Sequence, residues 1–304
     1  MKQLLILFSL LIIGQTTLAQ DEEFVDDNWL VSLPIAKLRA RESNKMILMV
    51  WENASKYPLP IVVRSENGKN VFIDNLFAEP KLSELLSQYF ILVKVSDEVY
   101  AHLFAEIDGK RKQSYIDKFN DDTLKVMDAN GNIVGTSGAY TELLNLSKFI
   151  FKYGLETSYI KQEITNYQRN KDFYSTFYLA SKYIDYSILI NDKVRSEILA
   201  LSDLYFQEAR QFLSKGDSKD KNSLSQRLYF TQLKQELVKG KSRKVLRALK
   251  KYEAPIEEVN IALVIFLRYT AYRLENDIEL FKTLEKEISL LNLKQAQLIV
   301  NINR

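Results

Sequence analysis

The chain has 304 residues and no cysteine, with 42 basic and 39 acidic side chains and one histidine. The missing thiols exclude thiol–disulfide chemistry carried out by this chain alone, and the nearly balanced charge gives no sign of a nucleic-acid-binding protein. The charge is divided unevenly, because acidic side chains outnumber basic ones in residues 20–155 and basic ones outnumber acidic ones in residues 156–304. The length is enough for about two domains.

The first 19 residues are predicted to be a cleavable secretory signal. Lys2 gives a positive start, an apolar run extends from Leu4 to Ile13, and small residues precede Gln20. This layout is typical of signal peptides, and the run is shorter than the ~20 residues that a membrane span needs. An uncleaved anchor is the alternative. We expect a mature chain that is periplasmic or extracellular and not transmembrane after signal removal.

Residues 20–154 alternate between patterns typical of strands and of helices. Continuous apolar runs predict buried strands, and apolar residues at helical spacing predict amphipathic helices. The expected elements are a helix over 29–44, a strand over 46–51, a short strand over 61–63 closed by a turn at 66–69, a helix from Pro80, a strand over 90–95, a hairpin over 124–134 and a helix over 143–153 that stops at Gly154.

Residues 155–304 carry almost only helical patterns. One predicted helix face contains Phe173, Phe177, Ala180, Tyr183 and Ile184, and another contains Val194, Ile198, Leu201, Leu204 and Tyr205. A helical hairpin is predicted from 260–274 and 278–291 across Glu275-Asn276-Asp277, with further breaks at Gly216-Asp217-Ser218, Gly240 and Pro255. Segments of this length suggest stacked helical pairs. No fixed period is visible, so a true repeat array stays open.

Four segments of the first half, taken in order along the chain, are similar to segments of a known superfamily. They are the Trp29 helix with Ala36 and Ala40 leading into the strand Ile47–Trp51, the pair Val71-Phe72 before the Pro80-Lys81-Leu82 helix, the strand Phe90–Val95, and the hairpin from Thr123 to Gly131 followed by Gly138-Ala139-Tyr140 and a helix. Together they resemble the thioredoxin-like superfamily, in its exported branch, over residues 26–153. The resemblance implies a central mixed sheet flanked by helices, here with a C-terminal helical extension that would be TPR-like if its helices repeat.

The chain departs from this superfamily at both of its signatures. The resemblance implies a Cys-x-x-Cys pair just after the first central strand, but these positions are Trp51, Glu52, Asn53, Ala54, Ser55, Lys56, Tyr57 and Pro58. It also implies a cis-proline before the closing hairpin, and that position is Asp122, followed by Thr123. A hydroxyl does not replace a thiol in disulfide exchange, and a cis bond at a residue other than proline costs ~3 kcal/mol, so we expect a degenerate redox site and a trans peptide at Asp122.

Two groups of residues raise the question of catalysis or metal binding. His102 is the single histidine, and a catalytic triad built on it lacks a Gly-x-Ser-x-Gly elbow, so we interpret it as a structural or surface residue. Asp117, Asp121, Asp122, Asp128 and Asn130 form an acidic cluster of the kind that hard cations bind. The EF-hand pattern is absent, and turn chemistry accounts for Asp128 and Asn130. We therefore predict no metal and no cofactor.

Two features of the second half suggest partners. A basic stretch begins at Lys234, and its predicted anionic-partner patch consists of Lys239, Lys241, Arg243, Lys244, Arg247, Lys250 and Lys251. Such a patch suits a lipid headgroup, a wall polymer or an acidic protein, and a solvated helix face is the alternative. Aromatic residues recur at helical spacing at Tyr174, Phe177, Tyr178, Tyr183, Tyr186, Tyr229 and Tyr269. They predict a helix–helix core, with a groove for a partner peptide as the second interpretation.

The sequence therefore predicts a signal peptide at 1–19, a thioredoxin-like α/β domain at 20–154 and an all-helical domain of hairpins at 155–304. The expected function is non-catalytic binding or scaffolding of another protein or peptide in the cell envelope, with no nucleic acid involved. Two alternatives stay open: a thiol–disulfide oxidoreductase by fold, which the missing cysteines contradict, and a cysteine-independent hydrolase that uses carboxylates.

Overall fold

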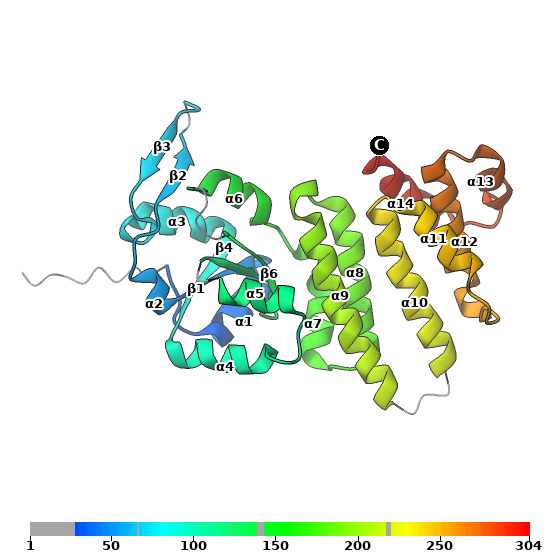
Figure 1. Cartoon of the computed structure of the whole chain (residues 1–304), viewed down its shortest axis with the longest axis horizontal. Coiled ribbons are helices and arrows are strands. Elements are labelled where there is room, and N and C mark those ends of the chain that lie inside the picture. The colour runs from blue at the N-terminus through cyan, green and yellow to red at the C-terminus, as the bar shows by residue number, and fades with distance from the viewer. Residues whose placement is uncertain (1–27, 66, 122, 139–142, 217–219) are drawn as a thin grey trace, which may run out of the picture.

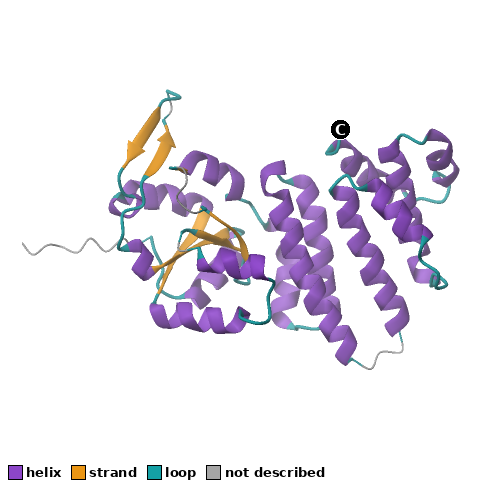
Figure 2. Ribbon diagram, viewed as in Figure 1, coloured by secondary structure: helices purple, strands orange, loops and turns teal. Residues whose placement is uncertain are grey.

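The computed structural model describes residues 28–65, 67–121, 123–138, 143–216 and 220–304. The predicted signal peptide, Asp122 and the Asp217-Ser218 break lie outside these ranges. The first half of the described chain is mixed α/β with small mixed sheets, and the second half is almost entirely helical, as the sequence predicts (Figures 1 and 2). Within the described residues, no helix is long and apolar enough to cross a membrane.

The α/β half contains two sheets within its described residues. Its elements are α1 (Leu33–Ser43), β1 (Met46–Trp51), α2 (Glu52–Ser55), β2 (Ile61–Arg64), β3 (Asn70–Ile73), η1 (Leu76–Ala78), α3 (Pro80–Tyr89), β4 (Phe90–Val95), α4 (Asp97–Ile107), α5 (Gln113–Asn120), β5 (Lys125–Met127), β6 (Ile133–Thr136), β7 (Leu144–Asn145) and α6 (Leu146–Tyr153).

The main sheet has the strand order β4-β1-β5-β6. β1 runs parallel to β4, with Leu48 opposite Leu92, and antiparallel to β5, which turns back into β6. β1 is buried along almost its whole length because neighbouring strands and helices cover it, which explains its continuous apolar sequence. The β5–β6 turn is closed by Gly131, whose φ of 90° is accessible to glycine at little cost. The second sheet has the order β3-β2-β7.

Two predicted helix starts are wrong, each because a backbone segment forms sheet contacts instead. The first helix begins at Leu33 rather than Trp29, since Leu30 donates its N–H to Leu92 and accepts from the N–H of Lys94, 3.0 and 2.8 Å away. Ser32 then caps the helix. The last helix of this half begins at Leu146, because Leu144–Asn145 pair with β2. The predicted strands at 46–51, 61–63 and 90–95, the helix from Pro80 and the hairpin are confirmed.

The helical half stacks antiparallel helices. It contains η2 (Ser158–Ile160), α7 (Lys161–Arg169), α8 (Phe173–Leu189), α9 (Asp192–Lys215), α10 (Lys221–Val238), α11 (Ser242–Lys250), α12 (Glu258–Glu275), α13 (Ile278–Leu284) and α14 (Leu290–Asn301). Each of α8, α10 and α12 packs on the helix that follows it and also on the next but one.

The predicted hairpin at the end of the chain is right in its turn and wrong in its second helix. Asn276 ends α12 in a left-handed conformation with a φ of 59°, and the side chain of Asp277 caps α13. The helix predicted over 278–291 breaks after Leu284, because Ser289 accepts a hydrogen bond from the N–H of Asn292 and starts α14. Gly240 and Pro255 lie in the breaks before and after α11, as predicted.

Candidate functional site

The positions predicted to be a degenerate redox site form a closed polar network at the end of β1. The carboxylate of Asp97 accepts hydrogen bonds from Trp51 Nε1 at 2.7 Å and from Asn53 Nδ2 at 2.6 and 2.8 Å. Asn53 Oδ1 accepts from Lys56 Nζ at 2.7 Å, and Ser55 Oγ donates to the carbonyl of Glu52. Asp97 thus links Trp51 to Asn53 and, through it, to Lys56, whereas Ser55 bonds within its own turn and Tyr57 is exposed.

An aromatic stack joins this network to the predicted cis-proline region. The Trp51 ring stacks on Tyr100 at 5.1 Å, and Tyr100 lies 4.5 Å from Phe119. The buried Lys125 places Nζ 5.3 Å from the Tyr100 ring and donates to the carbonyl of Asp121. These contacts connect the end of β1 to Asp121, and the trans peptide expected at Asp122 lies outside the described residues. A lysine in this core was not recognisable from the alternation of the strand.

The described side chains of the predicted acidic cluster bond to different partners and do not converge. Asp117 accepts from Gln113 on its own helix, and Asp121 accepts from the N–H and the hydroxyl of Thr123 and from Thr136 Oγ1. Asp128 points elsewhere, into the hairpin turn. Among the described residues, no three His, Cys, Asp or Glu side chains gather as a metal-binding group.

Asp128 is the polar centre of the junction between the two halves. Its Oδ1 accepts from the N–H groups of Asn130 and Asn132, at 3.0 and 2.8 Å, as turn chemistry predicts. Its Oδ2 accepts from the hydroxyls of Tyr183, at 3.3 Å, and Tyr205. Both tyrosines are buried and stack at 5.5 Å, with their planes 9° apart. One carboxylate thus ties the β5–β6 hairpin to α8 and α9.

Burial perturbs the acidity of this cluster. Removal from water raises the pKa of Asp128 above its ordinary value of 3.8, although the hydrogen bonds that it accepts act in the opposite direction. Burial and the nearby Asp128 also raise the pKa of Tyr183 and Tyr205 well above 10.0, so both hydroxyls remain donors. The hydrogen bonds of Asp128 therefore join the hairpin to both helices.

His102 and the basic patch both lie on the surface. His102 is exposed on α4, with Nδ1 3.7 Å from a carboxylate oxygen of Glu106. The patch residues surround α11, whose Val245 and Leu249 are buried. Ion pairs join Glu236 to Lys239, Lys241 and Lys244 and join Glu275 to Arg243. Arg247, Lys250 and Lys251 are exposed and make no ion pair with the described residues.

A groove of about 360 Å³ lies between α8, α10 and α12. Such a volume is at the lower end of ligand sites and accommodates a few side chains. Four aromatic residues of α8 form one wall, in two columns spaced i and i+4. Phe173 and Phe177 stack at 5.6 Å and are buried, whereas Tyr174 and Tyr178 are 48% and 58% exposed. The first two stabilise the helix packing, and the second two present aromatic surface to the groove.

The opposite wall carries polar groups. Arg227 lines the groove from α10 and donates one hydrogen bond, from Nη2 to the carbonyl of Val259 at 2.6 Å. Asn260, on α12, is fully buried and donates from Nδ2 to the carbonyl of Ser223. Its Oδ1 accepts no hydrogen bond from the described residues. A buried acceptor without a partner is costly to the folded protein.

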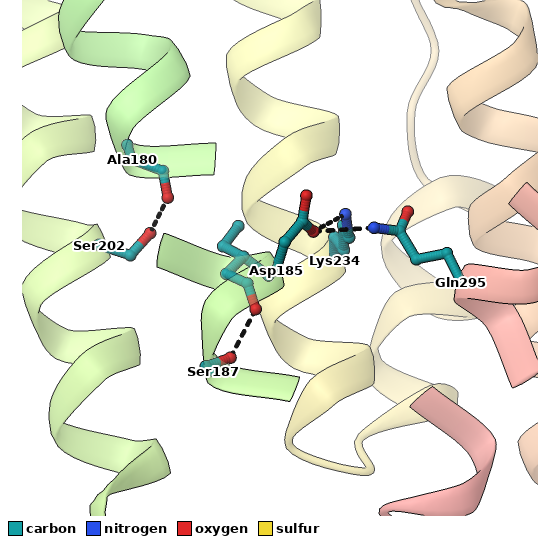
Figure 3. A network of polar contacts seen from close by, with 7 residues as sticks. Ala180, Asp185, Ser187, Ser202, Lys234 and Gln295 are labelled. Carbon is teal, nitrogen blue, oxygen red and sulfur yellow. Dashed lines mark hydrogen bonds and ion pairs between the residues drawn. The ribbon is translucent and has the colours of Figure 1, made fainter. Parts of the chain in front are cut away.

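Lys234 closes one end of the groove through a network that joins three helices. Its Nζ lies 2.5 Å from Asp185 Oδ1, which also accepts from Gln295 Nε2 of α14 at 2.8 Å (Figure 3). Nearby, Ser202 donates to the carbonyl of Ala180 and connects α9 to α8. Lys234 is therefore a buried structural cation, and its interpretation as the start of a surface basic stretch is wrong.

The groove corrects the interpretation of the aromatic residues in part. Phe177, Tyr183, Tyr186 and Tyr269 are core residues, as the helical spacing predicts, whereas Tyr174, Tyr178 and Tyr229 are exposed. Sequence reasoning missed Arg227 and Asn260, which lie on two helices and carry no local motif.

No protein-family model matches this chain, and no curated protein and no solved structure matches it either.

Proposed function

We propose that this chain is an exported, non-catalytic protein of the cell envelope that binds a segment of another protein in the groove between α8, α10 and α12. The observation that carries the proposal is the exposed aromatic surface of Tyr174 and Tyr178 on one wall of the groove, with the guanidinium-bearing Arg227 on the opposite wall. A peptide suits both walls, because its side chains cover aromatic rings and its backbone carbonyls accept hydrogen bonds from a guanidinium.

The α/β half is proposed to be a thioredoxin-like domain whose redox chemistry has been lost. Two features support this: β1 and β4 are adjacent and parallel, and the closing hairpin continues the sheet in the antiparallel direction. The absence of cysteine from the whole sequence removes the chemistry of the family, and the bonded Asp97 network stands where its thiols would be. Superfolds commonly serve functions unrelated to one chemistry.

Export to the envelope is proposed from the signal layout of residues 1–19. The alternative of an oxidoreductase requires thiols from another protein. The alternative of a carboxylate hydrolase requires acids that converge in a cleft. Two carboxylates, those of Glu106 and Glu208, line the polar cleft at the junction. The same cleft is lined by the cations Lys110, Arg111 and Lys171. Glu208 there accepts from the hydroxyl of Tyr167 with both oxygens, at 3.0 and 2.9 Å.

A capture experiment tests the proposed groove. The mature chain and a Tyr174→Ala/Tyr178→Ala variant are immobilised and exposed to envelope extract, and the retained proteins are quantified. Removal of two aromatic contact residues is expected to reduce capture of a specific partner ~10-fold or more, since each such contact contributes about 1 kcal/mol or more. Both side chains are exposed, so the variant should keep its helical content and melting temperature.

Tyr229→Ala provides the matched control, because Tyr229 is an exposed tyrosine of the same half and does not line the groove. It should capture the same proteins as the unaltered chain. Equal capture by the double variant and the control would contradict the assignment of the groove.

A further inference from the structure

The β2–β3 hairpin projects from the α/β half, and β3 forms its outer edge (Figure 1). β3 pairs with β2 on one side, and no strand of the described chain pairs with its other side. Val71 and Phe72 are 47% and 54% exposed. Native edge strands usually carry charges, proline or a bulge that prevents further pairing, but Asn70-Val71-Phe72-Ile73 has no charged residue and no proline.

The hydrogen-bond pattern identifies which backbone groups face the open edge. In an antiparallel pair, alternate residues exchange both backbone hydrogen bonds. Ser65 donates its N–H to the carbonyl of Lys69 at 2.8 Å, so the register makes Val71 and Ile73 the residues bonded to β2. The N–H of Arg64, opposite Asn70, donates instead to Ser147, away from β3. Asn70 and Phe72 therefore present N–H and C=O to the open edge.

We propose that β3 pairs antiparallel with β3 of a second copy of the chain, across a twofold axis at Phe72. This register matches the exposed donors and acceptors of the two strands. It places Phe72 opposite Phe72 of the other copy, Val71 opposite Ile73, and the Asn70 amide opposite the carboxylate of Asp74. Aromatic and β-branched cross-strand pairs stabilise sheets, and no like charges face each other.

The second copy, rather than a different strand, is favoured by this self-complementarity. An isologous contact uses the same edge of both copies and closes after two, so one exposed edge per chain gives a dimer and not a fibre. The edge of β3 is separate from the groove between α8, α10 and α12. The dimer and the proposed binding function can therefore be tested independently of each other.

Single-cysteine variants test the register, because the chain has no other thiol. At a hydrogen-bonded antiparallel pair the Cα atoms are about 5.5 Å apart, within the range of a disulfide. Phe72→Cys is therefore expected to form a covalent dimer under mild oxidation. Two copies of residue 71 would be offset by two residues, ~7 Å along the strand and ~5 Å across it, and thus too far apart. Val71→Cys should form no covalent dimer.

Phe151→Cys, on the exposed face of α6, measures random collisional cross-linking. A Phe72→Cys dimer yield no higher than that of Val71→Cys or Phe151→Cys would overturn the proposal. Sedimentation of the cysteine-free mature chain provides a second reading: we expect a dimer that Phe72→Lys converts to a folded monomer. A different result would assign the edge to another partner: the unaltered chain is monomeric, and the Phe72→Lys variant no longer captures an envelope protein. That result would also overturn pairing between copies.

Discussion

Replacing Asp128 with alanine is expected to lower the free energy of unfolding by about 3–5 kcal/mol, because four hydrogen-bond donors lose their acceptor. Two are the N–H groups of the hairpin turn, and two are the buried hydroxyls of Tyr183 and Tyr205. The hydroxyls lie between the sheet and the helices, where water does not easily replace a carboxylate. Urea unfolding followed by circular dichroism measures the change.

Asp117→Ala is the matched control, because Asp117 is an exposed aspartate that accepts a bond from Gln113 one helical turn away. Its cost should be at most about 0.5 kcal/mol. Equal effects of the two substitutions would show that the junction does not depend on Asp128.

The raised pKa of Asp128 determines the direction in which the stability of the protein changes with pH. Burial raises this pKa above 3.8, so the folded protein holds the proton more tightly than the unfolded chain. The contribution of this group to stability is therefore greatest at low pH and falls as the pH rises from 3.8 through the folded pKa. Asp128→Asn has no proton to titrate. From about pH 8 down to about pH 4, the stability of the unaltered protein should increase relative to Asp128→Asn, and parallel pH profiles would contradict this account.

Replacing Lys234 with alanine is expected to cost about 2–3 kcal/mol, because it leaves the carboxylate of Asp185 without its cation. The side chain of Lys234 is 8% exposed and that of Asp185 is 22% exposed, so water screens the remaining charge in part and the effect falls below that of a fully buried pair. Gln295 still donates to Asp185 and compensates for some of the loss. The network holds α8, α10 and α14 together (Figure 3), and its loss should loosen the end of the groove.

Lys244→Ala controls for the removal of a positive charge. Lys244 pairs with Glu236 at 3.0 Å but is 58% exposed, so its loss should cost at most about 1 kcal/mol. If thermal unfolding shows that Lys234→Ala costs no more than Lys244→Ala, the buried network does not stabilise the helical half. Removing both charges of the pair, by Lys234→Met with Asp185→Leu, should restore much of the stability.

The sequence predicted the elements whose pattern is local. β1 and β4 were recognisable because a strand covered on both faces is apolar throughout, and the β5–β6 hairpin because Asn130-Gly131 favours a tight turn. The predictions from sequence were wrong where contacts between distant residues override the local pattern. Trp29 has helical spacing to the residues that follow, but the backbone of Leu30 pairs with β4, more than 60 residues away.

The candidate site was predicted less well, for the same reason. Turn chemistry accounted for two of the bonds of Asp128, but its tyrosine partners lie 55 and 77 residues further along the chain. Lys234 was counted with the surface cations because a sequence does not show that Asp185 removes it from the surface. The groove unites Tyr174, Arg227 and Asn260 from three helices, and only the packing of alternate helices brings them together.

The central claim, that the groove binds peptide, is tested most directly by selection from a displayed library of random peptides. Residues 20–304 and their Tyr229→Ala variant should enrich the same group of sequences, rich in apolar side chains that cover Tyr174 and Tyr178. The Tyr174→Ala/Tyr178→Ala variant should bind these peptides at least ~10-fold more weakly in a titration, corresponding to a loss of about 1.4 kcal/mol. Undiminished affinity of the double variant for the same peptides would contradict the account.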